Sequence, residues 1–316
     1  MNSQSSTLET PLSQKKIMIK VENLTKQFGK FEALKGIDIS VKQGSIYGLI
    51  GPNGAGKTTL IKHLVGSYRQ NGGQVLIDGK PIYDNSEILK RVAYISDDLY
   101  YNTTDTVKKI AQFYRRIYPF FSERRYEALK GMFEIDENHL IRKMSKGMKK
   151  QVAFWLAISS MPDIMILDEP VDGLDPVTRR RVWSLIVQDV AERGTTVLIS
   201  SHNLRELEDV CDYVGIIYGG KILIEKDLDE LKTDIHKIQT SFEREVECII
   251  PENCRILFES KLGSVRNYII KGEKESILNW LNQFEPRFVD MLPLTLEEVF
   301  IYEIGGEGYE IKEIIL

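Results

Sequence analysis

The sequence predicts an α/β fold with a mostly parallel sheet, a β-rich lead-in and a small α+β appendage near the C-terminus. Short apolar runs of strand length alternate with stretches of helical periodicity between residues 17 and about 230. A glycine-rich loop, Gly51 to Thr59, stands between one of these runs and a helical pattern. From about Phe242 onward the pattern changes to short alternating runs and one helix, which is typical of a separate small domain.

Three parts follow from these patterns. Residues 1–16 contain no apolar segment of the kind found in secretory signals, and we expect a flexible, solvated tail there. Residues 17–234 form the large α/β domain, and a helical subdomain covers about 98–160 of it. Residues 235–316 form the α+β appendage, in which we find no catalytic constellation.

Composition narrows the partners that this chain could have. The net charge of −4 and the pI near 5.8 argue against a nucleic-acid partner, because such proteins usually carry a clear basic excess. The cysteines at 211, 248 and 254 are scattered and odd in number, which fits free thiols in a reducing cytosol. No apolar run approaches the roughly 18–20 residues that span a bilayer. If the protein acts at a membrane, we expect another chain to supply the membrane-spanning part.

The lead-in is expected to contain strands at Ile17–Val21 and Gly36–Val41, with turn signals between them. Phe28 lies between these strands, ahead of the glycine-rich loop. Its ring could stack on a purine base, or it could be a half-buried strand aromatic. The spacing agrees with both interpretations.

The glycine-rich loop matches the G-x-x-x-x-G-K-[ST] pattern, and it has the strand before it and the helix after it that the pattern requires. Its glycines let backbone N–H groups approach a phosphate, and the helix N-terminus adds positive potential. Lys57 can reach β- and γ-phosphates, and the Thr58 hydroxyl can ligate Mg²⁺. A simple connecting turn would not need all these residues. The loop therefore predicts a P-loop NTPase, with these nucleotide-binding residues: Asn53, Gly54, Ala55, Gly56, Lys57, Thr58 and Thr59.

A helical stretch follows from Thr103 to about Ile141, and it is unusually rich in aromatic residues between Tyr100 and Phe121. Most of these side chains could belong to the core, or they could line a groove that receives a helix of a partner. The next helix is expected to begin after Ser145, a plausible N-cap residue.

Polar residues stand at the ends of two later buried strands. The run Ile164–Leu167 ends in Asp168 and Glu169, and the run Thr196–Ser200 leads to His202. Following a phosphate loop, Asp168 can hold Mg²⁺ and Glu169 can deprotonate a water for attack on the γ-phosphate. His202 can hydrogen-bond the γ-phosphate. Alternatively, Asp168 and Glu169 could belong to a simple turn, and His202 could be a structural histidine. Because carboxyl ends of parallel strands meet at one edge of a sheet, we expect these residues near the loop.

The order of these motifs resembles the nucleotide-binding subunit of ATP-binding cassette (ABC) transporters over roughly residues 17–230. The residues that carry the resemblance are Phe28, the phosphate loop, Met144 to Met148, Ile164 to Glu169, Asp172 to Asp175, and His202. The resemblance implies an ABC-type ATPase core and a head-to-tail homo- or heterodimer that holds two ATP molecules with Mg²⁺.

Each ATP would then lie between the loop of one subunit and the signature of the other, which is Ser145, Lys146, Gly147 and Met148 here. The resemblance also implies that Phe28 stacks on adenine and that Asp175 communicates across the dimer. Asp97 falls where the family usually has a Gln that touches Mg²⁺ and couples to the membrane domain. The usual signature is Leu-Ser-Gly-Gly-Gln, so Lys146 and Met148 are departures. Since Ser145 and Gly147 remain, we expect activity to survive.

This variant signature is similar to that of the bacterial exporter branch, which includes antibiotic- and peptide-resistance systems. The resemblance implies a separate transmembrane permease, a drug, peptide or lipid-like substrate, and a cytoplasmic location on the inner face of the membrane. The permease would dock on the aromatic helical stretch and Asp97. A soluble ABC ATPase acting on ribosomes or DNA is disfavoured, because there is one cassette and no long coiled-coil insertion between Lys57 and Asp168. A small-molecule kinase would leave the signature unexplained.

Overall fold

A computed structural model describes residues 16–230, 235–243, 251, 253–295, 297–298 and 302. Residue contacts divide the chain into two compact units. The first comprises the residues up to Ser201 together with Gly215–Leu223, and the second comprises His202–Val214 and the residues from Ile224 onward. The predicted tail (1–16) and the predicted domain boundary after residue 234 stay predictions, because residues 1–15 and 231–234 lie outside the described part.

The lead-in forms an antiparallel sheet in the order β2-β1-β4-β5. Its strands are β1 (Ile17–Phe28), β2 (Phe31–Lys42), β4 (Gly72–Ile77) and β5 (Lys80–Pro81). The expected strand pair is confirmed and is longer than predicted, since β1 and β2 pair from Ile17↔Lys42 to Phe28↔Phe31. Alternate side chains of both strands are buried, which gives this sheet one apolar face.

The central sheet has the order β10-β9-β3-β8-β7-β6. Its strands are β3 (Ile46–Ile50), β6 (Val92–Ile95), β7 (Ile164–Asp168), β8 (Thr196–Ser201), β9 (Tyr213–Tyr218) and β10 (Lys221–Asp227). Strands β3, β8, β7 and β6 are parallel, as predicted, and β3, β7 and β8 are buried along their whole length. The register pairs Ile50 with Ser201 and Asp168 with Ser200, so the chain leaves all three strands at one edge of the sheet.

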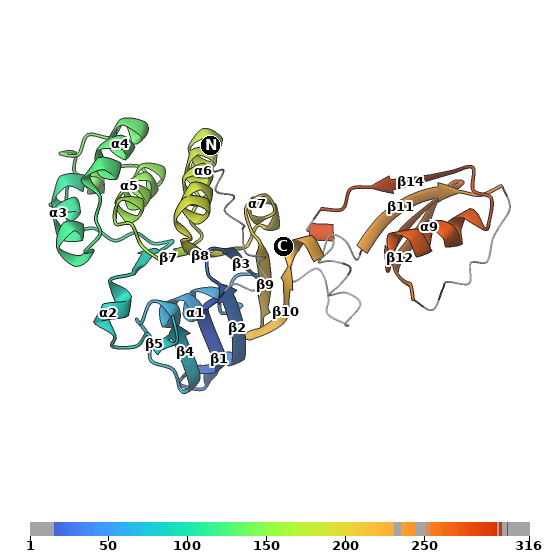
Figure 1. Cartoon of the computed structure of the whole chain (residues 1–316), viewed down its shortest axis with the longest axis horizontal. Coiled ribbons are helices and arrows are strands. Elements are labelled where there is room, and N and C mark those ends of the chain that lie inside the picture. The colour runs from blue at the N-terminus through green and yellow to red at the C-terminus, as the bar shows by residue number, and fades with distance from the viewer. Residues whose placement is uncertain are drawn as a thin grey trace, which may run out of the picture. The chain divides into compact units, whose positions relative to one another are not determined.

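The helices of the first unit are α1 (Lys57–Leu64), α2 (Ser86–Leu89), α3 (Val107–Ile117), α4 (Glu123–Phe133), α5 (Lys146–Ser159) and α6 (Pro176–Arg193). Helices α3, α4 and α5 lie together, green in Figure 1, within the span predicted for the helical subdomain. Among the aromatic residues in and around these helices, Tyr126 is buried and stacks on Trp155 at 4.7 Å between ring centroids, whereas Tyr100, Phe113 and Phe120 are exposed. The predicted partner groove lined by these aromatic residues stays a prediction.

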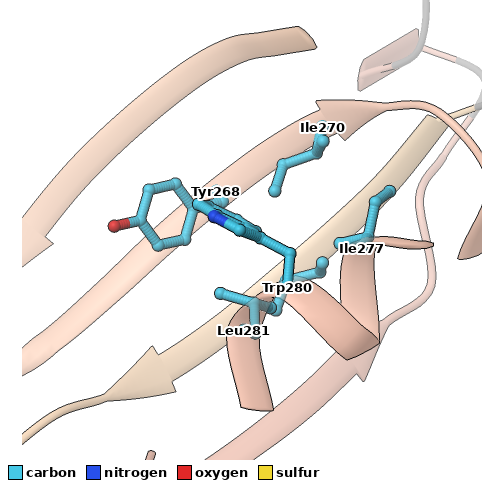
Figure 2. Packing of buried hydrophobic residues seen from close by; sticks show 6 residues of the cluster. Tyr268, Ile270, Ile277, Trp280 and Leu281 are labelled. Carbon is cyan, nitrogen blue, oxygen red and sulfur yellow. The ribbon is translucent and has the colours of Figure 1, made fainter. Parts of the chain in front are cut away.

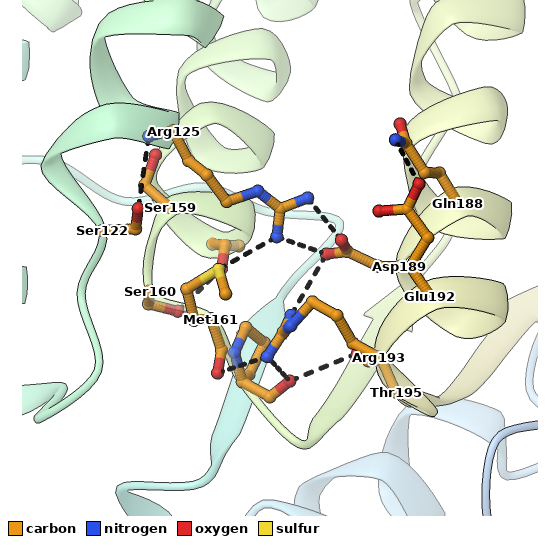
Figure 3. Close-up of polar contacts among 12 residues, drawn as sticks. Ser122, Arg125, Ser159, Ser160, Met161, Gln188, Asp189, Glu192, Arg193 and Thr195 are labelled. Carbon is orange, nitrogen blue, oxygen red and sulfur yellow. Dashed lines mark hydrogen bonds and ion pairs between the residues drawn. The ribbon is translucent and has the colours of Figure 1, made fainter.

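A buried ion-pair cluster joins α4 to α6 (Figure 3). The Asp189 carboxylate of α6 is fully buried and accepts hydrogen bonds from Arg125 of α4 and from Arg193 of its own helix. Arg193 also donates to the Met161 carbonyl oxygen at 2.8 Å. Two guanidinium groups therefore compensate the cost of burying one carboxylate, and they connect the helical region to the helix that follows β7.

The second unit contains an antiparallel sheet in the order β12-β13-β11-β14. The strands are β11 (Ile235–Ser241), β12 (Arg255–Leu262), β13 (Val265–Lys271) and β14 (Phe288–Leu292). Helix α9 (Lys274–Asn282) packs Ile277, Trp280 and Leu281 against Tyr268 and Ile270 of the sheet (Figure 2). This arrangement confirms the α+β appendage. The unit also includes α7 (Leu204–Leu207), and the strand-like run predicted at Val246–Ile250 lies outside the described residues.

Candidate functional site

The phosphate loop connects the buried strand β3 to α1, as the sequence predicts. Gly54 and Gly56 have φ angles of 81° and 115°, a region that favours glycine. A Cβ atom on Gly51 would lie 2.2 Å from the Ile217 carbonyl oxygen, so this position also accepts only glycine. Gly56 is the N-cap of α1, so the loop ends at a helix N-terminus, where backbone N–H groups favour an anion.

Lys57 is the first residue of α1, and its side chain is 6% exposed. Its ammonium group donates to the carbonyl oxygens of Gly51 at 2.6 Å and Pro52 at 3.3 Å. It also lies 3.5 Å from the Glu169 carboxylate. The loop thus holds a buried cation between its own carbonyl groups and the predicted general base.

Asp168 and Glu169 leave the end of β7 with different environments. The Asp168 carboxylate is buried and accepts a hydrogen bond of 2.5 Å from the Ser200 hydroxyl on β8. Glu169 has a φ of 46°, an uncommon value for a residue with a side chain. Its backbone N–H donates to the Ser200 hydroxyl and carbonyl oxygens, both at 3.2 Å. This backbone conformation directs the carboxylate to Lys57 while Asp168 stays tied to the sheet.

A cavity of about 310 Å³ lies over the loop. Its lining includes Lys57, Thr58, Glu169 and Asp97, so the residues predicted from three separate strand ends meet in one place. The remaining lining residues are Phe31, Ala33, Pro52, Asn53, Gly54, Gly56 and Thr59. Ala55 is buried in the loop and is not among them.

The aromatic ring that lines this cavity belongs to Phe31, which is not among the residues predicted from the sequence. Phe28 instead packs edge-on against Tyr68, 5.6 Å between ring centroids, with the Lys26 ammonium group over its face. The two phenylalanines are direct partners across the β1–β2 hairpin. A hairpin turn at Gly29–Lys30 with an aromatic residue on each side was the signal that could have identified Phe31. Stacking of Phe28 on a base stays a prediction.

The signature residues lie at the start of α5. Ser145 is exposed and caps the helix, because its hydroxyl oxygen accepts a 3.2 Å hydrogen bond from the Met148 N–H. A Cβ atom on Gly147 would lie 2.8 Å from the Gly173 carbonyl oxygen, which explains the glycine that the variant signature retains. None of the four signature residues is among the described residues that line the cavity.

Charged contacts join the signature to Asp97 and to the turn after β7. The Lys146 ammonium group lies 2.5 Å from Asp172 and 3.6 Å from Asp97, and these hydrogen bonds and charges raise the pKa of Lys146. The fully buried Lys150 lies 3.3 Å from Asp97. Lys150 is a further candidate site residue that the sequence alone does not identify, because nothing in the pair Lys149 and Lys150 shows which of the two is buried.

Two of the predicted site residues, Asp175 and His202, are not among the described residues that line the cavity. Asp175 is the N-cap of α6, and hydrogen bonds from the Thr178 hydroxyl, then from the backbone N–H groups of Thr178 and Val177, lower the pKa of its carboxyl group. His202 follows the last residue of β8 directly and is exposed. It is the first residue of the second unit, so its predicted contact with a γ-phosphate stays a prediction.

Comparison with known proteins gives concordant likenesses. A family model described as "ABC transporter" matches residues 34–172. The chain is 34% identical to the ABC transporter ATP-binding protein YtrB of Bacillus subtilis, over 92% of this chain and 99% of that protein. It is also 34% identical to the bacitracin transport ATP-binding protein BcrA of Bacillus licheniformis, over 92% and 98% of the two chains.

A solved structure, described as the ATP binding subunit of an ABC transporter, superposes with a TM-score of 0.64 at 28% identity. The match covers 68% of this chain and 92% of that one. Within the described residues of the present chain, no helix combines the length and apolar character that crossing a bilayer requires.

Proposed function

The chain belongs to the ATP-binding subunits of ABC transporters and is an ATPase, and from this premise we propose how its residues divide the work. The observation that carries the proposal is the meeting of Lys57, Thr58, Asp97 and Glu169 in one cavity over a glycine loop at a helix N-terminus. That arrangement suits a triphosphate whose terminal phosphate lies between the loop cation and a carboxylate base.

Each residue of the cavity has a distinct task. Lys57 neutralises charge on the β- and γ-phosphates, and the loop N–H groups hold their oxygens. Glu169 accepts a proton from the attacking water as that water approaches the γ-phosphorus in line with the leaving oxygen. The carboxylate can serve this role because its backbone is fixed by Ser200 while its side chain faces the cavity. Phe28 or Phe31 stacks on the adenine ring.

The oxygen donors at the site fit Mg²⁺. The exposed Thr58 hydroxyl and the Asp168 carboxylate are hard ligands of the type that this ion prefers, and Asp168 keeps one oxygen outside its bond to Ser200. No group of three or more His, Cys, Asp or Glu among the described residues could form a complete metal cage. This matches an ion that shares its coordination with phosphate and water. When bound, Mg²⁺ would neutralise charge on the phosphates.

We assign completion of the site to a second ATPase subunit. The signature residues stand at the exposed N-terminus of α5 and outside the cavity of their own chain, so they are available to a γ-phosphate held by a partner. Ser145 and Lys146 supply a hydroxyl and a positive charge there, and Asp175 contacts the partner near the same interface. The dimer is homomeric or heteromeric.

A groove on the helical side suits a segment of the membrane permease. This groove of about 490 Å³ has apolar walls that include Val65, Leu89 and Ile117, with the cations Lys90 and Arg116 at it. The remaining lining residues are Ser67, Ser86, Val92, Tyr94 and Tyr118. We propose that a cytoplasmic segment of a separate permease, with apolar side chains and a carboxylate, occupies it. Asp97, which we expected at this surface, lines the loop cavity instead.

The names of the relatives support a transported substrate of the drug or peptide type. BcrA is described as a bacitracin transport protein, and a further relative as the lantibiotic transport protein SrtF of Streptococcus pyogenes. We propose that this chain powers export of a drug, peptide or lipid-like substrate from the cytoplasmic face of the membrane. The net charge of −4 argues against a nucleic-acid partner.

The test is reconstitution with the membrane protein that co-purifies with the chain. Wild-type ATPase activity should rise in proteoliposomes that contain this partner, and the Arg116→Glu variant should bind the partner less well while hydrolysing ATP normally in its absence. A permease that binds Arg116→Glu as tightly as wild type would refute the groove assignment. Hydrolysis without any coupled movement of substrate would refute the transport role.

A further inference from the structure

Lys150 is a lysine whose side chain is completely buried, one turn into the signature helix α5. Its ammonium group has two described partners. It lies 3.3 Å from the Asp97 carboxylate and donates a short hydrogen bond to the backbone carbonyl oxygen of Glu169. The base of the hydrolytic step is therefore bonded, through its own peptide group, to the helix that carries the signature.

A buried ammonium group is costly unless charge and hydrogen bonds compensate it. Burial lowers the pKa of Lys150, and the nearby Asp97 charge acts in the opposite direction. A methionine or leucine would fill the same position without that cost. A cation here needs both the Asp97 carboxylate and the Glu169 carbonyl group as partners. The position therefore makes a polar connection, although an apolar side chain would be easier to bury.

The connection reaches Glu169 at a strained point of the chain. Glu169 has a φ of 46°, and Ser200 holds its N–H from the side of β8. Lys150 holds the carbonyl group of the same residue from the side of α5. The Glu169 backbone is thus fixed at both ends, and its carboxylate, 15% exposed, remains directed to Lys57 and the cavity.

Asp97 links this contact to the cavity and to the signature. It lines the cavity over the loop, and besides Lys150 it lies within 3.6 Å of Lys146. The carboxylate is 42% exposed, so nucleotide or partner groups can reach it, whereas Lys150 is enclosed. A change in the surroundings of Asp97 has a direct path to the Glu169 peptide group, across a single buried side chain.

We propose that Lys150 is a positioning residue for hydrolysis, which couples Asp97 and the signature helix to the orientation of Glu169. The inference depends on the role of Glu169 as general base. It also gives the unusual Asp97 a task, because its negative charge is the counter-ion that a buried lysine needs and that a neutral side chain would not supply.

The test compares Lys150→Met with Lys143→Met, a control that changes an exposed lysine whose ammonium group has no partner among the residues that the structure describes. Lys150→Met keeps the length and apolar stem of the side chain but removes the donor. We expect kcat to fall about 10- to 100-fold because a small displacement of the base is enough for such a loss. The Kd for ATP should stay within about two-fold, since Lys57 and the loop are unchanged. Lys143→Met should match wild type in both.

A purely structural role is separated by two further measurements. In the Glu169→Gln background, Lys150→Met should produce no further loss of the residual single-turnover rate, because its effect passes through Glu169. Asp97→Asn removes the counter-charge of Lys150 but leaves its hydrogen bond to the Glu169 carbonyl group, and we expect it to lower kcat per folded molecule about 3- to 10-fold.

An unchanged kcat per folded molecule in both Lys150→Met and Asp97→Asn would overturn the proposal, as would full additivity with Glu169→Gln. If Glu169→Gln itself hydrolyses ATP at the wild-type rate, the assignment of the base is wrong and this inference is wrong with it. If Glu169→Gln is inactive and Lys150→Met is normal, only the inference is wrong.

Discussion

The proposed site has two halves, the loop half with Lys57, Asp168 and Glu169, and the signature half at the start of α5. The two halves differ in how far contacts within one chain hold their side chains in place. In the loop half, Lys57 is 6% exposed and bonded to loop carbonyl groups and Glu169, and Asp168 is buried against Ser200. In the signature half, Ser145 and Lys146 are exposed at the tip of α5 and lie outside the cavity. A buried, preorganised half suits tight binding of nucleotide, and an exposed half suits a contact that forms and breaks with a second subunit.

The largest expected effect falls on the loop half without removing binding. Glu169→Gln preserves the shape of the side chain and removes the base, so turnover should drop by about 10²- to 10⁴-fold while ATP still binds. ATP should also trap a dimer, which size-exclusion chromatography would show. Hydrolysis near the wild-type rate would mean that Glu169 is not the base.

A change in the signature half should leave binding to the isolated chain intact. Ser145→Arg places a bulky side chain at the helix tip, and we expect turnover to fall about ten-fold or more with an unchanged ATP Kd for the monomer. Isothermal titration and a steady-state ATPase assay measure the two quantities. Equal losses of affinity and turnover would place Ser145 inside its own chain's binding site and would contradict its assignment to the site of a partner subunit.

Removing the loop cation should change the other quantity, the affinity for ATP. Lys57→Ala is expected to weaken ATP binding by about ten-fold or more, because a buried charge-assisted contact to the phosphates is lost. The titration that serves for Ser145→Arg serves here as well. Unchanged affinity would remove the loop half from the account of nucleotide binding.

The smallest effect on the site should come from the buried cluster between α4 and α6. Asp189→Asn removes the counter-charge of Arg125 and Arg193, and we expect it to lower the free energy of unfolding by about 3 kcal/mol. Since the cluster contacts neither half of the site, kcat and ATP affinity per folded molecule should change little. Chemical denaturation and the ATPase assay together test this, and a selective loss of turnover would show that the cluster transmits more than stability.

The two halves also differ in how much of them the sequence predicts. The loop residues could be identified because a phosphate loop is a local motif, in which strand, glycines, lysine and helix follow one another along the chain. Asp168 and Glu169 could be placed near it because parallel strands share an edge. These inferences need only strand order and spacing.

The contacts of Phe31, Lys150 and Lys146 depend on tertiary packing that spacing does not specify. Phe28 and Phe31 flank one turn, and only the hairpin register decides which ring faces the cavity. Lys149 and Lys150 are adjacent, and only the rotation of α5 buries the second. The appendage was predicted from its alternation pattern, but its small core around Trp280 follows from how α9 packs on the sheet.

The division of the site between two subunits can be measured directly by mixing two impaired variants, Lys57→Ala and Ser145→Arg. In a head-to-tail dimer that contains one chain of each variant, one site carries both changes and the second site carries neither. Random exchange should therefore restore about a quarter of the wild-type ATPase rate if the two sites act independently. If the chain forms a homodimer, as cross-linking of the wild type would show, a mixture no more active than its two components would contradict the account, because each chain would then complete its own site.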